Sequence, residues 1–180
     1  MLDVQANRLI ELFYEQHDIT CNQKYSKTLP YSFHLKNVVE VAKKFNQYIP
    51  KEDYNLIRVA CAGHDLIEDA RLSYNDIAYH NQELADIIYL CTELRGKDRD
   101  ERKPKEFYEQ LATNKYAVFV KLCDFISNYL FSVYTQSSFA KTYSNEYYNK
   151  INVYLADYRI IFPRMFAYMD AILELNQTSK

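Results

Sequence analysis

The chain has 180 residues, a formal net charge of −2 and 48% hydrophobic residues, which is the balance of one globular domain. The near-neutral charge excludes a general attraction to nucleic acid, and no apolar run approaches the roughly 20 residues that span a bilayer. Two glycines and four prolines are few for a protein with many tight turns, so we expect helices joined by short polar loops.

The cysteines and the N-terminal segment favour a cytoplasmic protein. Cys21, Cys61, Cys91 and Cys123 are isolated from one another, without the CxxC spacing of a metal knuckle, and the last three lie in apolar helical patterns. This usage is typical of reduced, buried thiols and not of a disulfide framework. The N-terminal segment is charged and amphipathic and lacks the layout of a signal peptide.

Apolar residues recur at helical spacing along most of the chain. Helices are predicted over residues 3–16, 31–47, 73–80, 82–93, 115–133, 144–158 and 163–175. A further helix follows the start signal at Pro50–Asp53 and runs through Ile67. This helix is apolar nearly all round, so it should be the central, buried one. No linker or repeat divides the chain, and we expect an all-α, single-domain helical bundle over residues 1–180.

Four polar residues stand near the end of the central helix, in the segment 61–70 with the sequence CAGHDLIEDA. On a continuous helix His64 and Glu68 would share one face, and Asp65 and Asp69 the neighbouring face. Buried carboxylates need a metal, a salt-bridge partner or water. Imidazole and carboxylate are common ligands of divalent metals, so a metal is the simplest partner, with further ligands supplied from elsewhere in the chain.

Two other segments offer such ligands. His34 lies in the first turn of the helix predicted over 31–47, where a single histidine more often has a capping or surface role. Asp124 lies in the middle of the apolar helix predicted over 115–133, and Asn128 follows one turn later on the same face. An acid on a buried helix needs an electrostatic partner.

Residues 94–105 form a charged connection with six basic and three acidic side chains. A run of this kind is usually a solvated loop. The alternative is a basic loop at the edge of a binding site, which receives a phosphorylated ligand. Lys97 and Arg99 would be among its cations, Gly96 would allow the loop to bend, and Pro104 would end it. The composition leaves both interpretations open.

The polar residues of these segments form an ordered H…HD…D set that resembles the HD-domain metal-dependent phosphohydrolases. The set consists of His34, His64, Asp65 and Asp124. Three blocks sharpen the resemblance: PYSFH at 30–34, HDLIED at 64–69 and KLCDFISN at 121–128. They are similar to the PYxxH motif, the HDxxED box and the KLADRLxN helix of RelA/SpoT-type (p)ppGpp hydrolase domains, in that order. Together the three blocks extend this resemblance over roughly residues 8–160. The chain is also similar to the stand-alone small alarmone hydrolases.

The resemblance implies a fold of the HD-domain type and roles for particular residues. One divalent metal, Mn²⁺ in the family, would be held by His34, His64, Asp65 and Asp124. The family's ED pair, which orients or deprotonates the attacking water, would be Glu68 and Asp69, and the sequence does not choose between them. The substrate would be held by Asn128 near the nucleotide, by Lys24 of a loosely aligned basic pair, and by Lys97 and Arg99 of the charged loop.

The implied activity is that of a hydrolase that removes the 3′-pyrophosphate of (p)ppGpp with a metal-activated water. Its partner would be a small-molecule nucleotide, with no nucleic acid and no membrane. The sequence departs from the family at Gln23, Leu35 and Phe125, where a basic residue, proline and arginine are expected. These departures affect positions that would recognise the nucleotide. An HD-type nucleotide phosphatase, similar to a 5′-nucleotidase, therefore stays an alternative activity.

A hypothesis of another class is a non-catalytic HD module that binds a nucleotide or a protein. The tyrosine-rich stretch 143–148 could then serve a partner or a homo-oligomer, or it could be ordinary surface. Bound metal in the purified protein would speak against the non-catalytic hypothesis.

Overall fold

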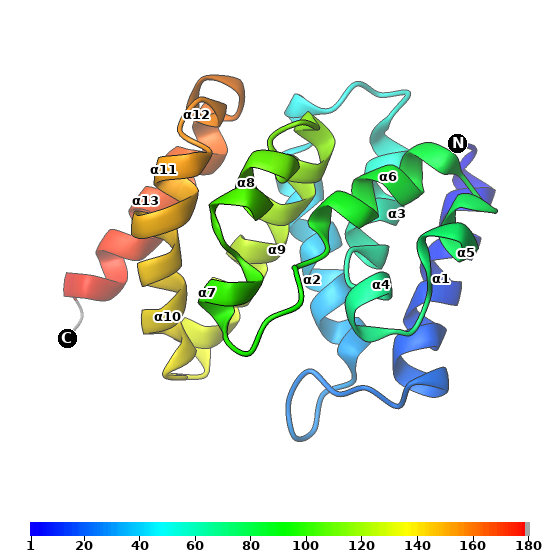
Figure 1. Ribbon diagram of the computed structural model, residues 1–180, viewed down its shortest axis with the longest axis horizontal. Helices are drawn as coiled ribbons and strands as arrows, with labels where there is room; N and C mark the ends of the chain where they lie inside the picture. Colours follow the sequence, from blue (N-terminus) through cyan, green and yellow to red (C-terminus); the bar gives the residue numbers. More distant parts are fainter. Residues whose placement is uncertain (179–180) are drawn as a thin grey trace.

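The computed structural model describes residues 1–178, and within them the chain is all-helical, without a β-strand (Figure 1). The α-helices are α1 (Asp3–Glu15), α2 (Tyr31–Lys44), α3 (Tyr54–Gly63), α4 (Leu66–Asp69), α5 (Tyr74–Ala78), α6 (Gln82–Cys91), α7 (Arg99–Arg102), α8 (Lys105–Leu111), α9 (Lys115–Tyr134), α10 (Phe139–Glu146), α11 (Asn152–Tyr154), α12 (Tyr158–Ile161) and α13 (Pro163–Thr178). Shorter turns are π-helical in η1 (Gln16–Thr20) and η3 (Tyr147–Ile151) and 3₁₀ in η2 (Asn46–Tyr48). The prediction of an all-α protein is confirmed.

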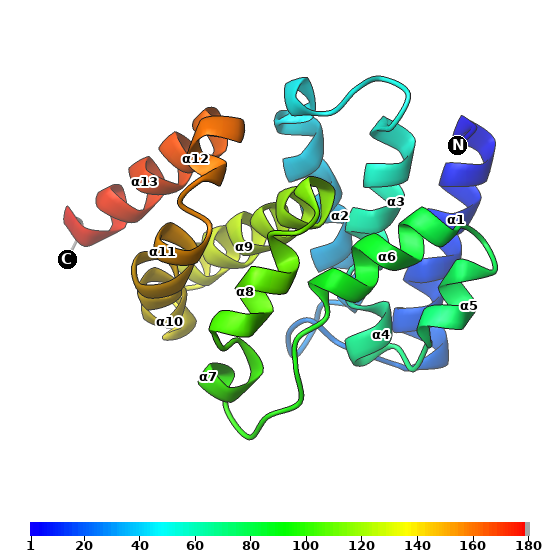
Figure 2. The same ribbon diagram turned by 45° about the horizontal axis from the view of Figure 1, so that its top comes forward.

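Helix α9 is the axis of the domain. The side chain of Asn114 begins it by accepting hydrogen bonds from the backbone N–H groups of Tyr116 and Ala117. Of its 20 residues, 14 are buried, because α2, α3, α6, α10 and α13 all pack against it. In both views α1–α6 lie on one side of α9 and α10–α13 on the other (Figures 1 and 2).

By length and composition alone, α9 could cross a membrane, contrary to the expectation that no apolar run approaches that length. Its most apolar stretch is 78% buried inside the protein, because other helices cover it. This burial is typical of the core helix of a soluble domain, and the cytoplasmic location stays a prediction.

One hydrophobic core runs from Ala6 in α1 to Leu173 in α13, so the described chain is a single compact domain. The last two residues of the predicted range 1–180 lie outside the described residues. Within the core, α1 and α2 both pack against α3. Gly63 allows the close approach of α1, because a Cβ there would lie 2.9 Å from the ring of Phe13.

The central helix is not continuous through the HD segment. It ends at Gly63, and α4 begins at Leu66. Asp65 between them has φ −101° and ψ 6°, outside the helical region. The prediction of one helix that runs through Ile67 is therefore wrong: His64 follows the end of α3, and Glu68 lies in α4.

Two further predictions change in detail. The helix predicted over 144–158 consists of the end of α10, the π-helical turn η3 and the short α11, and at η3 the Tyr147 hydroxyl donates to Asp170 of α13 at 2.5 Å. The charged connection 94–105 contains α7 and the start of α8. Asp98 begins α7, because its side chain accepts hydrogen bonds from two backbone N–H groups of the first turn.

Candidate metal centre

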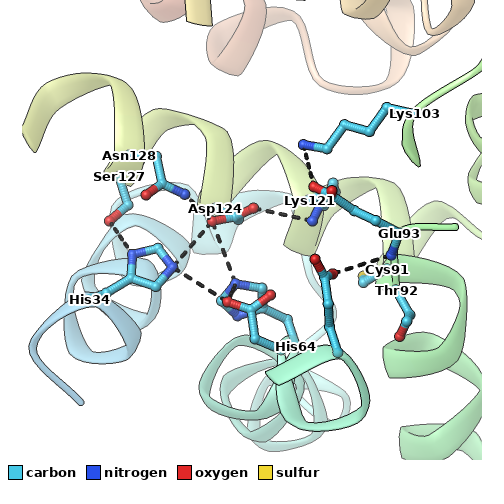
Figure 3. A network of polar contacts seen from close by, with 12 residues as sticks. His34, His64, Cys91, Thr92, Glu93, Lys103, Lys121, Asp124, Ser127 and Asn128 are labelled. Atoms are coloured by element: carbon cyan, nitrogen blue, oxygen red, sulfur yellow. Dashed lines mark hydrogen bonds and ion pairs between the residues drawn. The ribbon is translucent and has the colours of Figure 1, made fainter. Parts of the chain in front are cut away.

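Three parts of the fold bring the predicted metal ligands together, and we call His34, His64, Asp65 and Asp124 the His–Asp cluster. His34 lies in the first turn of α2, His64 and Asp65 lie between α3 and α4, and Asp124 lies in the middle of α9. Nε2 of His34 is 3.2 Å from Oδ1 of Asp124, and Nε2 of His64 is 3.4 Å from the same oxygen (Figure 3). Oδ2 of Asp65 lies 3.0 Å from Nε2 of His64 and 3.8 Å from Nε2 of His34.

Both imidazoles direct their Nε2 atom toward the centre of the cluster. Nδ1 of His64 is 2.8 Å from the Cys61 carbonyl oxygen, so Nδ1 carries a proton and Nε2 is the nitrogen that faces the carboxylates. Nδ1 of His34 is 3.5 Å from the hydroxyl of Ser127 on α9. Nε2 of His64 is fully buried and makes no hydrogen bond of acceptable geometry, although carboxylates surround it. A buried nitrogen of this kind is ready to bind a cation.

The donor set suits a divalent metal. Around a metal with bonds of about 2.1 Å, ligands at right angles lie about 3.0 Å apart, close to the 3.0 Å and 3.2 Å contacts of the cluster. The ligand atoms of His34, His64 and Asp124 all lie within 4.8 Å of one another. This buried group could hold a divalent ion, with Asp65 beside it. The choice of Mn²⁺ stays a prediction.

The electrostatics of the cluster favour a positive charge at its centre. Burial by itself lowers the pKa of His64, but the carboxylates of Asp65 and Asp124 outweigh it and hold this pKa well above the usual value. Burial by itself raises the pKa of each carboxyl group, but His64 and Lys121 keep both pKa values below the usual range. Ionised carboxylates that attract a proton attract a metal cation for the same reason.

Neighbouring side chains hold the two carboxylates in place. Asn128 donates to Oδ1 of Asp124 at 2.5 Å, and Nζ of Lys121 lies 3.3 Å from the other oxygen of that group. The hydroxyl of Tyr31 donates to Oδ2 of Asp65 at 2.5 Å. Such outer contacts fix the direction in which a ligand presents its lone pairs.

Glu68 follows the cluster on α4. Its Oε2 accepts a hydrogen bond from the backbone N–H of Glu93 at 3.2 Å. Burial is the largest cause that raises its pKa to about 7, and the charges of Glu93 and Asp65 act in the same direction, while Lys121 acts against them. A carboxyl group with this pKa exchanges a proton near neutral pH, which general acid–base chemistry requires.

Asp69, the other member of the pair, is held by side chains from the segment before α2. Its Oδ2 accepts a hydrogen bond from Gln23 at 3.1 Å and lies 3.4 Å from the Tyr31 hydroxyl. Burial and the charge of Asp65 raise its pKa, while the hydrogen bond from Gln23 lowers it. Gln23, which stands where the family would have a basic residue, therefore contacts the candidate catalytic acid directly.

A cavity of about 1020 Å³ adjoins the cluster, with Tyr25, Phe33, Asn128, Phe131 and Tyr143 among its lining residues. The Tyr25 hydroxyl donates to Oδ1 of Asn128 at 2.8 Å, and Asn128 reaches the cluster through its other side-chain atom. Asn128 therefore lies between Asp124 and this cavity, and its predicted place near the nucleotide stays a prediction. Tyr25 also stacks on a residue of the His–Asp cluster, because its ring centroid is 4.7 Å from that of His34.

The predicted substrate cations lie in different environments. Lys24 is exposed in the loop before α2, and Lys97 is exposed in the loop before α7. Arg99 is half-buried, and its guanidinium donates to Glu146 at 2.8 Å and 2.5 Å. The roles of Lys24 and Lys97 stay predictions, whereas Arg99 is engaged by a carboxylate of its own chain.

Several residues of the site had no role in the sequence analysis. The PYxxH motif gives a signal for Tyr31, since it places a hydroxyl three residues before His34. His17, Gln23 and Tyr25 lie between the helices predicted over 3–16 and 31–47. They approach the site from the π-helical turn η1 and the loop that follows it, which no periodicity reveals.

Phe125, the departure next to Asp124, does not face the cluster. Its ring packs on Tyr129, Tyr143 and Tyr147, with centroids about 6 Å away. The substitution therefore affects the packing of α9 against α10 and η3 and leaves the metal ligands untouched.

Comparison of the chain with protein-family models gives no match, and comparison with curated proteins gives none. The resemblance to HD domains therefore rests on the three sequence blocks, and membership in that family stays a prediction. The geometry of the cluster stands apart from the resemblance, since it follows from the distances alone.

Proposed function

We propose that the protein is a metal-dependent phosphohydrolase of the HD-domain type that removes the 3′-pyrophosphate of ppGpp or a close nucleotide analogue. The observation that carries the proposal is the convergence of the four residues of the His–Asp cluster from three parts of the fold. The same four residues form the H…HD…D set, so the sequence pattern and the geometry support one another.

The residues of the chain divide into metal ligands and proton carriers. When held by the His–Asp cluster, the metal would polarise a phosphoryl oxygen and lower the pKa of a water molecule. Glu68 is the better candidate to receive the proton of that water, because its pKa of about 7 lies close to neutral pH. Asp69 is fixed by Gln23 and Tyr31, which suits a carboxylate that orients the water.

The adjoining cavity supports a nucleotide substrate. Its lining combines aromatic rings with a few polar groups, which is the composition of a small-molecule site. A base can stack on such rings, while Asn128 joins the cavity to Asp124. The reacting phosphate would then lie at the cluster and the base in the cavity.

The test is a nucleotide panel that includes ppGpp, incubated with purified protein and Mn²⁺ and analysed for pyrophosphate and for orthophosphate. We expect pyrophosphate from ppGpp, its loss in His64→Ala, and unchanged release in the control His80→Ala, whose histidine is exposed and lies outside the motif. Orthophosphate from other nucleotides with ppGpp intact would contradict the alarmone assignment. No bound metal and no thermal shift with Mn²⁺ would favour a non-catalytic module.

A second candidate, a nucleotide phosphatase, is favoured by one observation. Glu146 accepts hydrogen bonds from Arg99 and Lys103, so two cations beside the site are already neutralised within the chain. A site with fewer free cations is better matched to a single phosphate than to a pyrophosphate. Release of orthophosphate from nucleoside monophosphates, measured in the same panel, would select this candidate.

A further inference from the structure

A chain of hydrogen bonds runs from a buried histidine outside the HD motif to Asp69. His17 lies in the π-helical turn η1 and is fully buried. Its Nδ1 is 2.6 Å from Oε1 of Gln23, and Nε2 of Gln23 donates to Oδ2 of Asp69 at 3.1 Å. The path therefore consists of two hydrogen bonds, one between the imidazole and the amide and one between the amide and the carboxylate.

The carboxylate at the end fixes the direction of both links. Ionised Asp69 can only accept, so the Gln23 amide must turn its NH₂ group toward it and its oxygen toward His17. Nδ1 of His17 must then carry the proton. Its Nε2 is buried without a partner, which suits a lone pair, because a second N–H there would have no acceptor. His17 is thus neutral, with its proton on Nδ1.

Contacts of the surrounding backbone keep His17, Gln23 and Asp69 at the positions that these two hydrogen bonds require. The backbone N–H of Gln23 donates to the His17 carbonyl at 2.9 Å, and Asn22 turns the chain with a left-handed φ of 48°. Gln16, the first residue of η1, donates to the carbonyl of Ala70 at 2.8 Å, directly after α4. The π-helical turn is therefore attached to the same end of α4 that carries Asp69.

His17 also supports Tyr31. The two rings stack with centroids 4.7 Å apart and an interplanar angle of 16°. The hydroxyl of Tyr31 lies between the carboxylates of Asp65 and Asp69, at 2.5 Å and 3.4 Å. One buried imidazole therefore supports both neighbours that hold Asp69.

We infer that His17 is a positioning residue that acts through Gln23 to fix the carboxylate of Asp69 in the orientation needed for water attack. The inference rests on the proposed function for its effect on turnover. The hydrogen-bond arrangement itself can be measured without any substrate.

The first test compares variants of His17 in the hydrolysis assay. His17→Phe keeps a ring on Tyr31 and removes the donor, so we expect kcat to fall about tenfold with KM unchanged, as for loss of an outer contact to a site residue. His17→Asn places an amide N–H near the position of Nδ1 and should restore most of kcat. The matched control is His80→Phe, on the surface, with wild-type kcat.

The second test breaks the other link. Gln23→Met removes both hydrogen bonds, and Gln23→Glu can still accept from His17 but turns a charge toward Asp69. Both should lower kcat about tenfold or more. Wild-type kcat in His17→Phe and Gln23→Met, together with loss of activity in Asp69→Asn, would overturn the inference.

The third test reads the tautomer directly by long-range ¹H–¹⁵N correlation of the labelled protein. We expect neutral His17 with the proton on Nδ1, and loss of this preference in Gln23→Met. A proton on Nε2 would overturn the inference even in an active enzyme. Absence of hydrolysis in the wild-type protein would instead contradict the proposed function, so the two failures are distinguishable.

Discussion

Two buried polar clusters among the described residues differ in whether the chain satisfies their hydrogen bonds. In the Glu146 cluster (Glu146, Arg99, Lys103 and Tyr108), Oε1 accepts from the lysine and the tyrosine at 3.0 Å each, and Oε2 accepts from the arginine at 2.8 Å and 2.5 Å. In the His–Asp cluster, carboxylates and imidazole nitrogens converge, and Nε2 of His64 has no hydrogen-bond partner. The Glu146 cluster needs no partner from outside the chain, whereas the His–Asp cluster could hold a cation.

The pKa values show the same contrast. Burial raises the pKa of Glu146, but Lys103 and Arg99 outweigh it and lower this pKa to about 2. Glu68, beside the His–Asp cluster, has its pKa raised to about 7, chiefly by burial. The first carboxylate is stabilised in its charged form, and the second is kept ready to exchange a proton.

The sharpest test of the contrast is Asp124→Asn, which removes a charged ligand without changing the size of the side chain. We expect metal-dependent hydrolysis to fall by about 10³-fold or more, and the rise in Tm that Mn²⁺ gives the wild-type protein to disappear. Activity assays and thermal unfolding with and without Mn²⁺ check this. An unchanged metal-induced shift in Tm would remove Asp124 from the metal site.

The matching change in the satisfied cluster is Glu146→Gln. It removes the counter-charge of the half-buried Arg99 and one of the two carboxylates that contact the buried Lys103, which keeps Glu93 at 2.8 Å, so we expect the free energy of unfolding at pH 7 to fall by about 2 kcal/mol. Urea unfolding measures this. The shift in Tm with Mn²⁺ should persist in the folded variant, because Glu146 is not a ligand. Loss of that shift would mean that the two clusters are not independent.

The effect of Glu146 should depend on pH in a defined direction. Its pKa is about 4.5 when unfolded and about 2 when folded, so its stabilisation is present above pH 4.5 and is lost as the pH falls toward 2. The difference in unfolding free energy between the wild-type protein and Glu146→Gln should therefore shrink between pH 5 and pH 3. A constant difference across this range would contradict the electrostatic explanation.

Glu68→Gln should act on function and stability in opposite directions. We expect kcat to fall about 10²-fold if Glu68 carries the proton. Because its folded pKa of about 7 lies above the usual 4.5, ionisation of Glu68 destabilises the fold increasingly as the pH rises from about 4.5 to about 7, and by a constant amount above that. The metal-free variant should therefore unfold at a higher urea concentration than the wild-type protein at pH 8, and at the same concentration near pH 4.

The smallest expected effect belongs to the exposed lysine of the charged loop. Lys97→Ala should raise KM for a pyrophosphorylated nucleotide about threefold at low salt and less at high salt, because salt screens an exposed charge. Lys105→Ala, on α8 and paired with Glu109, is the matched control and should leave KM unchanged. A KM for Lys97→Ala equal to that of the control would remove Lys97 from the substrate site.

The helices and the residues of the His–Asp cluster were accessible to sequence analysis, but the neighbours of that cluster were not. The apolar periodicity of residues 115–133 predicts α9, and the polar exceptions to it, Asp124 and Asn128, are the residues that face the site. His17 and Gln23 follow no period, because they reach Asp69 through a turn and a loop. The engagement of Arg99 by Glu146 joins residues 47 positions apart, which no local pattern indicates.

The sequence by itself determined that the protein is helical and that His64, Asp65 and Asp124 lie in buried segments, because periodicity and the cost of burying charge are local properties. The tertiary structure decided that His34, in the first turn of its helix, is buried as well. The tertiary structure decided which of the buried charges remain unsatisfied. It also decided that the chain leaves α3 at Gly63, so that His64 and Asp65 present their side chains from a turn and not from one face of a helix. Hydrogen-bond partners are chosen by packing between distant segments, and only the folded chain brings those segments together.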